Sequence, residues 1–158
     1  MKRLILLTVC LLTLNLAFSQ SGHIKFMGVE VNGQVSTLDQ RLATKGFSKT
    51  KDGLYKGKFS GYEVKLKLQT SVKSKVVYSI TVMFGDNITK DELSEMAASL
   101  REKYSEGTPF ENGSSKDASQ VGVELPEGTI MIDFSNKTLS YIDKANLQKN
   151  AKESKADL

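Results

Sequence analysis

The sequence is poor in the residues that most often carry chemistry or cross-links. Its 158 residues include one cysteine, one histidine, two prolines and no tryptophan. A single cysteine cannot form an intramolecular disulfide or supply the paired thiolates of a structural zinc site. The single histidine, His23, leaves a serine triad with only one candidate base. These absences point away from disulfide-stapled folds, cysteine metal sites and histidine-based catalysis.

The longest apolar run lies at the N-terminus. Met1-Lys2-Arg3 is followed by a mostly apolar run from Leu4 to Phe18 that includes the one cysteine, and Ala17-Phe18-Ser19 provides small residues for cleavage. The run is shorter than the roughly 20 residues that span a bilayer, and its basic start is typical of a signal peptide. We predict a signal peptide at residues 1–19, export to the periplasm or the cell exterior, and no transmembrane span in the mature chain.

Two segments have helical spacing and helix-start signals. Ser36 or Thr37 can cap a short helix that ends near Gly46, where a left-handed residue is favoured. The second segment starts at Thr89-Lys90-Asp91-Glu92, which is a capping box, and apolar residues follow it at helical spacing as far as Gly107. We therefore predict one helix in each half of the mature chain.

Alternation of apolar and polar residues predicts six strands in two groups of three. They are Tyr55–Phe59, Tyr62–Gln69, Val76–Phe84, Val121–Leu125, Ile130–Phe134 and Leu139–Ile142. Ser60-Gly61 fits a two-residue hairpin turn that pairs Phe59 with Tyr62 and Lys58 with Glu63. The order of a helix and three strands, repeated, predicts an α+β fold with about six antiparallel strands and both helices on one face.

These elements define one domain at residues 20–143. The remaining residues, 144–158, are polar with few apolar side chains, so we expect a frayed tail.

A set of short motifs near the start of the mature chain resembles a known group of proteins. His23-Ile24-Lys25-Phe26-Met27-Gly28 is followed by Gly33, by Lys45-Gly46-Phe47, and by Lys56-Gly57-Lys58-Phe59 before Gly61-Tyr62. This pattern, across residues 23–84, resembles small uncharacterised exported proteins common in Bacteroidetes. The resemblance implies a compact sheet protein with two helices, and it brings no functional residue. The duplicated layout is also similar to β-lactamase-inhibitor-like folds, in architecture alone.

Motifs for catalysis and cofactor binding are missing. The chain has no G-x-S-x-G turn, no metal-loop spacing of carboxylates and no P-loop. Asp133 and Glu124 could support glycoside hydrolysis if the fold held them about 5–10 Å apart, and otherwise they are solvated strand residues. We therefore expect no enzymatic activity, no cofactor and no metal site.

Charge is distributed unevenly along the chain. Lys45 to Lys75 contains nine lysines and two acids, a net charge of +7, whereas Phe84 to Asp133 contains eleven acids and four bases, a net charge of −7. Four lysines alternate with the apolar residues of the first hairpin and should gather on its outward face: Lys56, Lys58, Lys65 and Lys67.

Two functions follow from this lysine face, besides the simple one of keeping the sheet soluble. The first is a non-enzymatic binding module for an anionic ligand. The alternative is an inhibitor-like or interaction protein that targets another exported protein. Nucleic acid is not an expected partner, because no exposed aromatic residues interleave the lysines.

Overall fold

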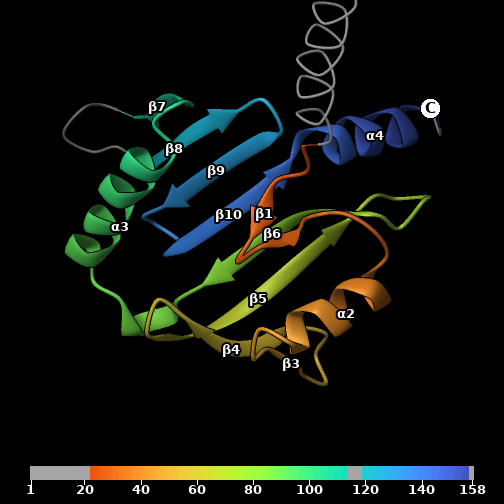
Figure 1. Cartoon of the computed structure of the whole chain (residues 1–158), viewed down its shortest axis with the longest axis horizontal. Coiled ribbons are helices and arrows are strands. Elements are labelled where there is room, and N and C mark those ends of the chain that lie inside the picture. Colours follow the sequence, from red (N-terminus) through yellow and green to blue (C-terminus); the bar gives the residue numbers. More distant parts are fainter. Residues whose placement is uncertain (1–21, 114–118, 157–158) are drawn as a thin grey trace, which may run out of the picture.

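The computed structural model describes residues 22–113 and 119–156, so the predicted signal peptide at residues 1–19 lies outside the described residues. The described part contains three α-helices, one 3-10 helix and ten strands. Eight of the strands form a single antiparallel sheet in the order β3-β4-β5-β6-β10-β9-β8-β7 (Figure 1). Their bounds are β3 Ser48–Lys49, β4 Tyr55–Phe59, β5 Tyr62–Thr70, β6 Val77–Met83, β7 Thr108–Asn112, β8 Gln120–Leu125, β9 Gly128–Asp133 and β10 Thr138–Asp143. The α+β class with an antiparallel sheet is thus confirmed.

The sheet consists of two similar halves that meet at β6 and β10. Helix α2 (Val35–Ala43) precedes β3 to β6, and helix α3 (Lys90–Lys103) precedes β7 to β10. The strand order is mirrored about the β6–β10 pair, in which Val82 lies opposite Leu139. The predicted unit of a helix and three strands is therefore wrong by one strand in each half.

Within the eight-stranded sheet, the two strands that were not predicted are its edges, β3 and β7. Strand β3 has only two residues, Ser48 and Lys49, and both are exposed. Strand β7 contains Pro109 and is exposed except for the half-buried Phe110. Neither strand has the apolar alternation on which strand prediction depends, because an edge strand is often short, polar or interrupted by proline.

One face of the sheet is apolar and carries the core. A continuous row of buried side chains crosses six strands in register: Tyr55, Leu66, Val82, Leu139, Ile132 and Val121. Leu38 and Leu42 of α2, and Leu93 and Ala97 of α3, belong to the same core cluster, so both helices pack against this face.

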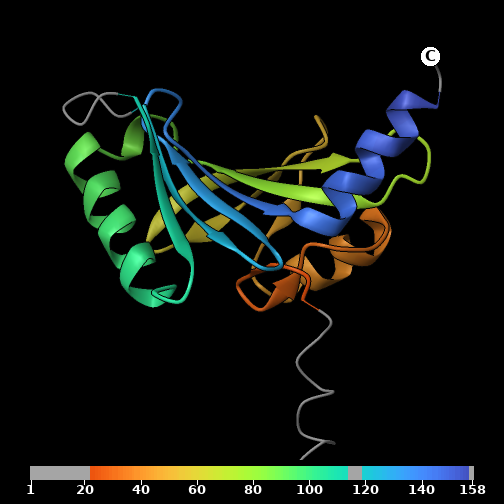
Figure 2. The same cartoon turned by 90° about the horizontal axis from the view of Figure 1, so that it is seen from above.

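A short N-terminal hairpin also packs on the apolar face. It consists of β1 (Lys25–Phe26) and β2 (Val29–Glu30), and Figure 2 shows it beneath the curved sheet, between α2 and α3. The ring of Phe26 contacts Phe47, Phe59 and Tyr141, with centroids 5.4–5.8 Å apart. The opposite face of the sheet carries the outward side chains of the alternation and is called the open face below.

The predicted cap of the first helix is wrong: α2 begins at Val35, so Ser36 and Thr37 lie inside it, and its N-cap residue, Gln34, makes no side-chain capping hydrogen bond. Two other local predictions are confirmed. Thr89 caps α3 through the predicted reciprocal bonds with Glu92. The β4–β5 hairpin has the predicted register, with Phe59 opposite Tyr62 and Lys58 opposite Glu63.

The C-terminal residues differ from the expectation of a frayed tail, because they form helix α4 (Lys144–Lys155) beside β6. Asp143 caps this helix by accepting a hydrogen bond from the Asn146 amide. The buried Asn146 side chain donates to the carbonyl oxygens of Val31 and Val77. The helix is held by polar contacts with distant residues, which hydrophobic patterning does not detect.

Candidate ligand-binding site

The four predicted lysines lie on the open face, on β4 and β5. All four are exposed, and Lys56 lies directly opposite Lys65 in the β4–β5 register. Lys58 lies opposite Glu63, with its Nζ 3.7 Å from Glu63 Oε1. Lys67 lies opposite Thr81 of β6. The alternation in the sequence therefore predicted the shared face of these lysines correctly.

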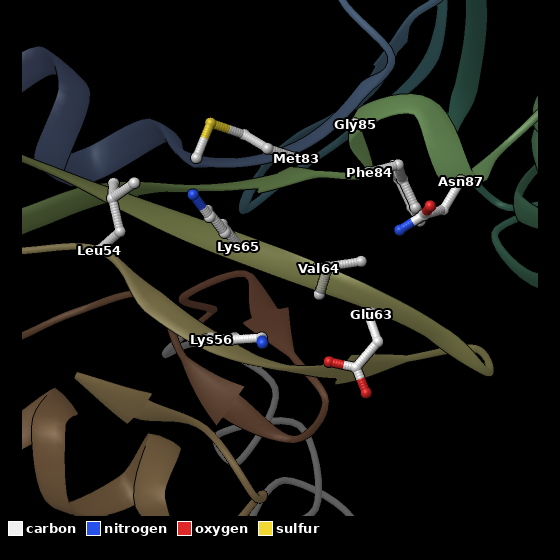
Figure 3. A pocket seen from close by; sticks show the side chains of 9 residues that line it. All are labelled: Leu54, Lys56, Glu63, Val64, Lys65, Met83, Phe84, Gly85 and Asn87. Carbon is white, nitrogen blue, oxygen red and sulfur yellow. The ribbon is translucent and has the colours of Figure 1, made fainter. Parts of the chain in front are cut away.

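The open face is hollowed next to two of these lysines. The hollow has a volume of about 710 Å³. Figure 3 shows that the lining comes from the turn before β4, from strands β4, β5 and β6, and from the 3-10 helix η2 (Gly85–Asn87) with the residue before it. They are Leu54, Lys56, Glu63, Val64, Lys65, Met83, Phe84, Gly85 and Asn87. Lys58 and Lys67 lie outside this lining, so the structure divides the predicted cluster into an inner and an outer pair.

The inner pair, Lys56 and Lys65, makes the hollow electropositive. Side chains directly opposite each other in an antiparallel pair have Cβ atoms about 5 Å apart, and like charges at such positions repel. Within the described residues, neither amine lies within ion-pair distance of a carboxylate. The charge of Lys65 nevertheless reaches Asp52: a hydrogen bond from Thr50 lowers the pKa of that carboxyl, and the Lys65 charge lowers it further.

Glu63 is the acidic residue in the lining, and Lys58 faces it from the neighbouring strand. Both side chains of this pair are more than half exposed, so their attraction is weak and screened by salt. The pair reduces the negative charge that Glu63 adds beside the two inner lysines.

The rest of the lining gives the hollow apolar and hydrogen-bonding character. Leu54 and Met83 are half-buried, while Val64 and Phe84 are buried members of the core cluster that also border the hollow. Asn87 contributes an amide that can donate or accept a hydrogen bond. An arrangement of two ammonium groups, one amide and an apolar floor suits an anion that also has an apolar part.

Sequence reasoning missed Leu54, Met83 and Asn87. Met83 follows the outward phase of the third predicted strand, so alternation could have identified it. Leu54 and Asn87 lie outside regular strands, and only the tertiary structure brings them to the lysines.

His23 is hydrogen-bonded to a buried carboxylate at the end of β10. Its Nδ1 lies 2.8 Å from Oδ2 of the fully buried Asp143. The same oxygen accepts a hydrogen bond from the Ile24 amide, and the other carboxylate oxygen caps α4. These hydrogen bonds hold the first described residues of the chain against the C-terminal end of β10.

The two candidate carboxylates on the second half do not converge. Glu124 lies opposite Thr129, whereas Asp133 lies opposite Gln120. Four residues along a strand correspond to about 13 Å, which exceeds the separation used by glycosidases. Although partial burial opposes the shift, hydrogen bonds from Asn136 and Gln120 lower the pKa of Asp133. Asp133 therefore stabilises the β9–β10 turn as a carboxylate.

Among residues 22–113 and 119–156, no three side chains of His, Cys, Asp or Glu are grouped as metal ligands. No helix in this part of the chain has the length and apolarity to cross a bilayer. Comparison with known proteins adds no relative: no protein-family model, curated protein or solved structure matches the chain.

Proposed function

We propose that the protein is an exported, non-enzymatic binding module that holds an anionic ligand in the hollow of its open face. The observation that carries this proposal is the opposition of Lys56 and Lys65 beside an apolar floor. Two like charges on adjacent strands repel each other in the free protein. An anion placed between them replaces that repulsion with two charge-assisted contacts.

The lining further limits the kind of ligand. An inorganic ion would leave Leu54 and Met83 without contacts, whereas a ligand with an apolar portion would cover them. Phosphorylated lipid headgroups and acidic polysaccharides are anions that an exported protein can reach. Lys58 and Lys67 extend the positive surface beyond the hollow and would attract the ligand at longer range.

The test compares two double variants that remove the same charge. Lys56→Gln with Lys65→Gln removes the inner pair, and Lys152→Gln with Lys155→Gln removes two exposed lysines from the end of α4. Binding to heparin and to phosphatidylglycerol vesicles is measured at several salt concentrations. We expect the first variant to bind at least about tenfold more weakly, because a charge-assisted hydrogen bond contributes about 1.5–3 kcal/mol.

The control decides whether the site is specific. The α4 variant should bind nearly as well as the native protein if the hollow is the site. Equal losses in both variants would show a response to net charge alone, and the proposal would then be wrong. Adding Lys58→Gln and Lys67→Gln to the inner pair should further reduce the salt dependence of binding.

A second candidate function is interaction with another exported protein, including a second copy of this chain. The separation of charge across the sheet favours it: the lysines lie on β4 and β5, while Glu124 and Asp133 lie on β8 and β9. These strand pairs flank the central β6–β10 pair on opposite sides. A protein surface with the complementary arrangement of charge would fit this face.

A further inference from the structure

A second cleft lies on the other side of the sheet, among the elements that cover the apolar face. Its volume is about 510 Å³. The walls come from the β1–β2 hairpin, helix α3 and the β4–β5 turn, and β10 forms the floor. Its lining includes Lys25, Met27, Met96, Ser99, Leu100, Lys103, Tyr104 and Tyr141.

One wall of the cleft is an apolar stripe on α3. Met96, Leu100 and Tyr104 recur every four residues, so they share one side of the helix. They pack against the edge of the core and stay half-buried, whereas Leu93 and Ala97 of the same helix are buried within it. The stripe thus faces the cleft and keeps apolar surface available to a ligand.

The opposite wall is the tip of the hairpin. Phe26 points into the core, where it contacts Phe47 and Phe59. Met27, the next residue, is 40% exposed and lines the cleft. Methionine side chains are flexible and polarizable, and a cleft with Met27 and Met96 on facing walls can adapt to an aliphatic chain.

One end of the cleft is polar and basic. Lys25 and Tyr104 also line an adjoining hollow, which places them at the same end. The Nζ atom of Lys103 lies 5.2 Å from the centre of the Tyr104 ring, so Lys103 belongs to this end as well. Among the described residues, neither Lys25 nor Lys103 forms an ion pair.

The floor contributes a buried phenol. Tyr141 is 5% exposed, and its hydroxyl has no hydrogen-bond partner in the described part of the chain. Burial raises the pKa of Tyr141 far above its usual range, and the nearby Tyr104 raises it further. A tyrosine hydroxyl is protonated at neutral pH in any case and can donate a hydrogen bond.

We propose that this cleft binds a single-chain amphipathic anion, whose aliphatic chain lies along Met96 and Leu100 and whose acidic head lies between Lys25 and Lys103. The head accepts a hydrogen bond from the Tyr141 hydroxyl, which lines the cleft and donates to no other group among the described residues. The chain covers the methionine and leucine side chains that the fold leaves partly exposed.

The geometry limits the length and position of the ligand. From Met96 to Tyr104 the helix advances eight residues, or about 12 Å, which suits a chain of medium length. Glu30 lies opposite Lys25 in the hairpin, and Glu127 lines the adjoining hollow. These acids repel an anion beyond Lys25, so the head stays on the Lys103 side.

The distribution of methionines allows a direct test. Met27 and Met96 line this cleft, whereas Met83 lines the hollow on the open face. We would label the methionine methyl groups with carbon-13 and titrate the protein with dodecanoate below its micelle concentration. The expected result is saturable shifts at Met27 and Met96 with no shift at Met83. Shifts at Met83 alone, or at no methionine, would overturn the proposal.

Headgroup and chain are tested with matched ligands. Hexanoate has too short a chain to follow the stripe, and dodecyl maltoside has the chain without the charge. Each should bind at least about tenfold more weakly than dodecanoate. Dodecyl phosphate should bind comparably, because the two lysines recognise charge and not a particular acid. Equal binding of the neutral ligand would refute the assignment of the lysines.

Three variants locate the site. Ser99 is exposed on α3 and lines the cleft, so Ser99→Trp should block the chain and abolish the methyl shifts. Lys25→Gln with Lys103→Gln should weaken dodecanoate binding about tenfold, and Tyr141→Phe by a smaller factor, because the ring remains. Lys90→Gln, at the other end of α3, is the control and should leave the affinity unchanged.

This inference is independent of the proposed function, because the two sites lie on opposite faces of the sheet. Loss of dodecanoate binding in the Ser99→Trp protein, with normal binding to heparin, would support both assignments separately. An unchanged dodecanoate affinity in the Ser99→Trp protein would refute the cleft alone.

Discussion

Asp143 holds together segments that lie far apart in the sequence, and no local sequence pattern indicates these contacts. The carboxylate is fully buried and ends β10. It accepts hydrogen bonds from the amide of Asn146 at 2.9 Å, from the amide of Ile24 at 3.2 Å and from His23 Nδ1 at 2.8 Å. A buried charge is tolerated when several donors satisfy it, and these donors come from both ends of the described chain.

We predict that Asp143→Ala lowers the free energy of unfolding by about 2–4 kcal/mol, because it removes a helix cap and leaves the Ile24 amide buried without an acceptor. Urea denaturation followed by circular dichroism measures the loss. Asp86→Ala is the control, since Asp86 is exposed on η2 and should change stability by less than about 0.5 kcal/mol. Similar small effects in both variants would contradict the structural role of Asp143.

At the scale of elements, α4 is held to the β5–β6 turn by two side chains near its C-terminus. Asn150 accepts a hydrogen bond from the Val72 amide, and Glu153 accepts from the amides of Lys73 and Ser74. Hydrogen bonds from the Ser74 side chain and from these amides lower the pKa of Glu153 to about 2. The helix is therefore attached at both ends, at Asp143 and at Glu153.

This attachment should depend on pH in a defined direction. The Glu153 carboxylate has a pKa of about 2 when docked, compared with 4.5 for a free glutamate. A lowered pKa means that docking is fully favoured above pH 4.5 and is lost as the pH falls from there towards 2. Amide chemical shifts of Lys73 and Ser74, followed by NMR across this range, measure the transition.

The conservative variant identifies the group responsible. Glu153→Gln keeps the shape of the side chain and removes the ionisable group, so the Lys73 and Ser74 shifts should lose their transition below pH 4.5. A transition that persists in this variant would assign the effect to another carboxylate.

At the scale of the whole molecule, the order of strands places the basic and the acidic stretches of the sequence at opposite ends of the sheet. The basic stretch from Lys45 to Lys75 forms β3 to β5 and the turn after them, on one side of the β6–β10 pair. The acidic residues of α3, β8 and β9 lie on the other side. Opposite charge at the two ends of one sheet favours antiparallel association between copies.

We predict that a dimer forms at low ionic strength and dissociates as salt is raised above about 0.15 M, where the Debye length is about 8 Å. Sedimentation velocity at several salt concentrations measures this change. Reversing two charges, with Lys58→Glu and Lys67→Glu, should abolish the dimer, whereas Lys152→Glu with Lys155→Glu should leave it. A monomer at every salt concentration would remove the support for self-association.

An element of the fold could be predicted where the residues that specify it lie close together in the sequence. The Thr89 capping box and the Ser60-Gly61 hairpin encode their structure within a few residues, and both predictions are confirmed. The edge strands β3 and β7 have no such signal, since their place in the sheet comes from hydrogen bonds to a neighbouring strand. Helix α4 was missed for a related reason, because polar contacts with distant residues hold it.

The sequence by itself determined the α+β class, the core face of the central strands and the common side of the four lysines, because alternation has a period that the backbone imposes. Only the tertiary structure decided which residues meet across the chain. His23 and Asp143 are 120 residues apart, yet their side chains are hydrogen-bonded. Met83 and Asn87 likewise reach Lys56 only after the strands have paired. Such contacts depend on the global packing of elements, and no pattern within one segment of the chain specifies them.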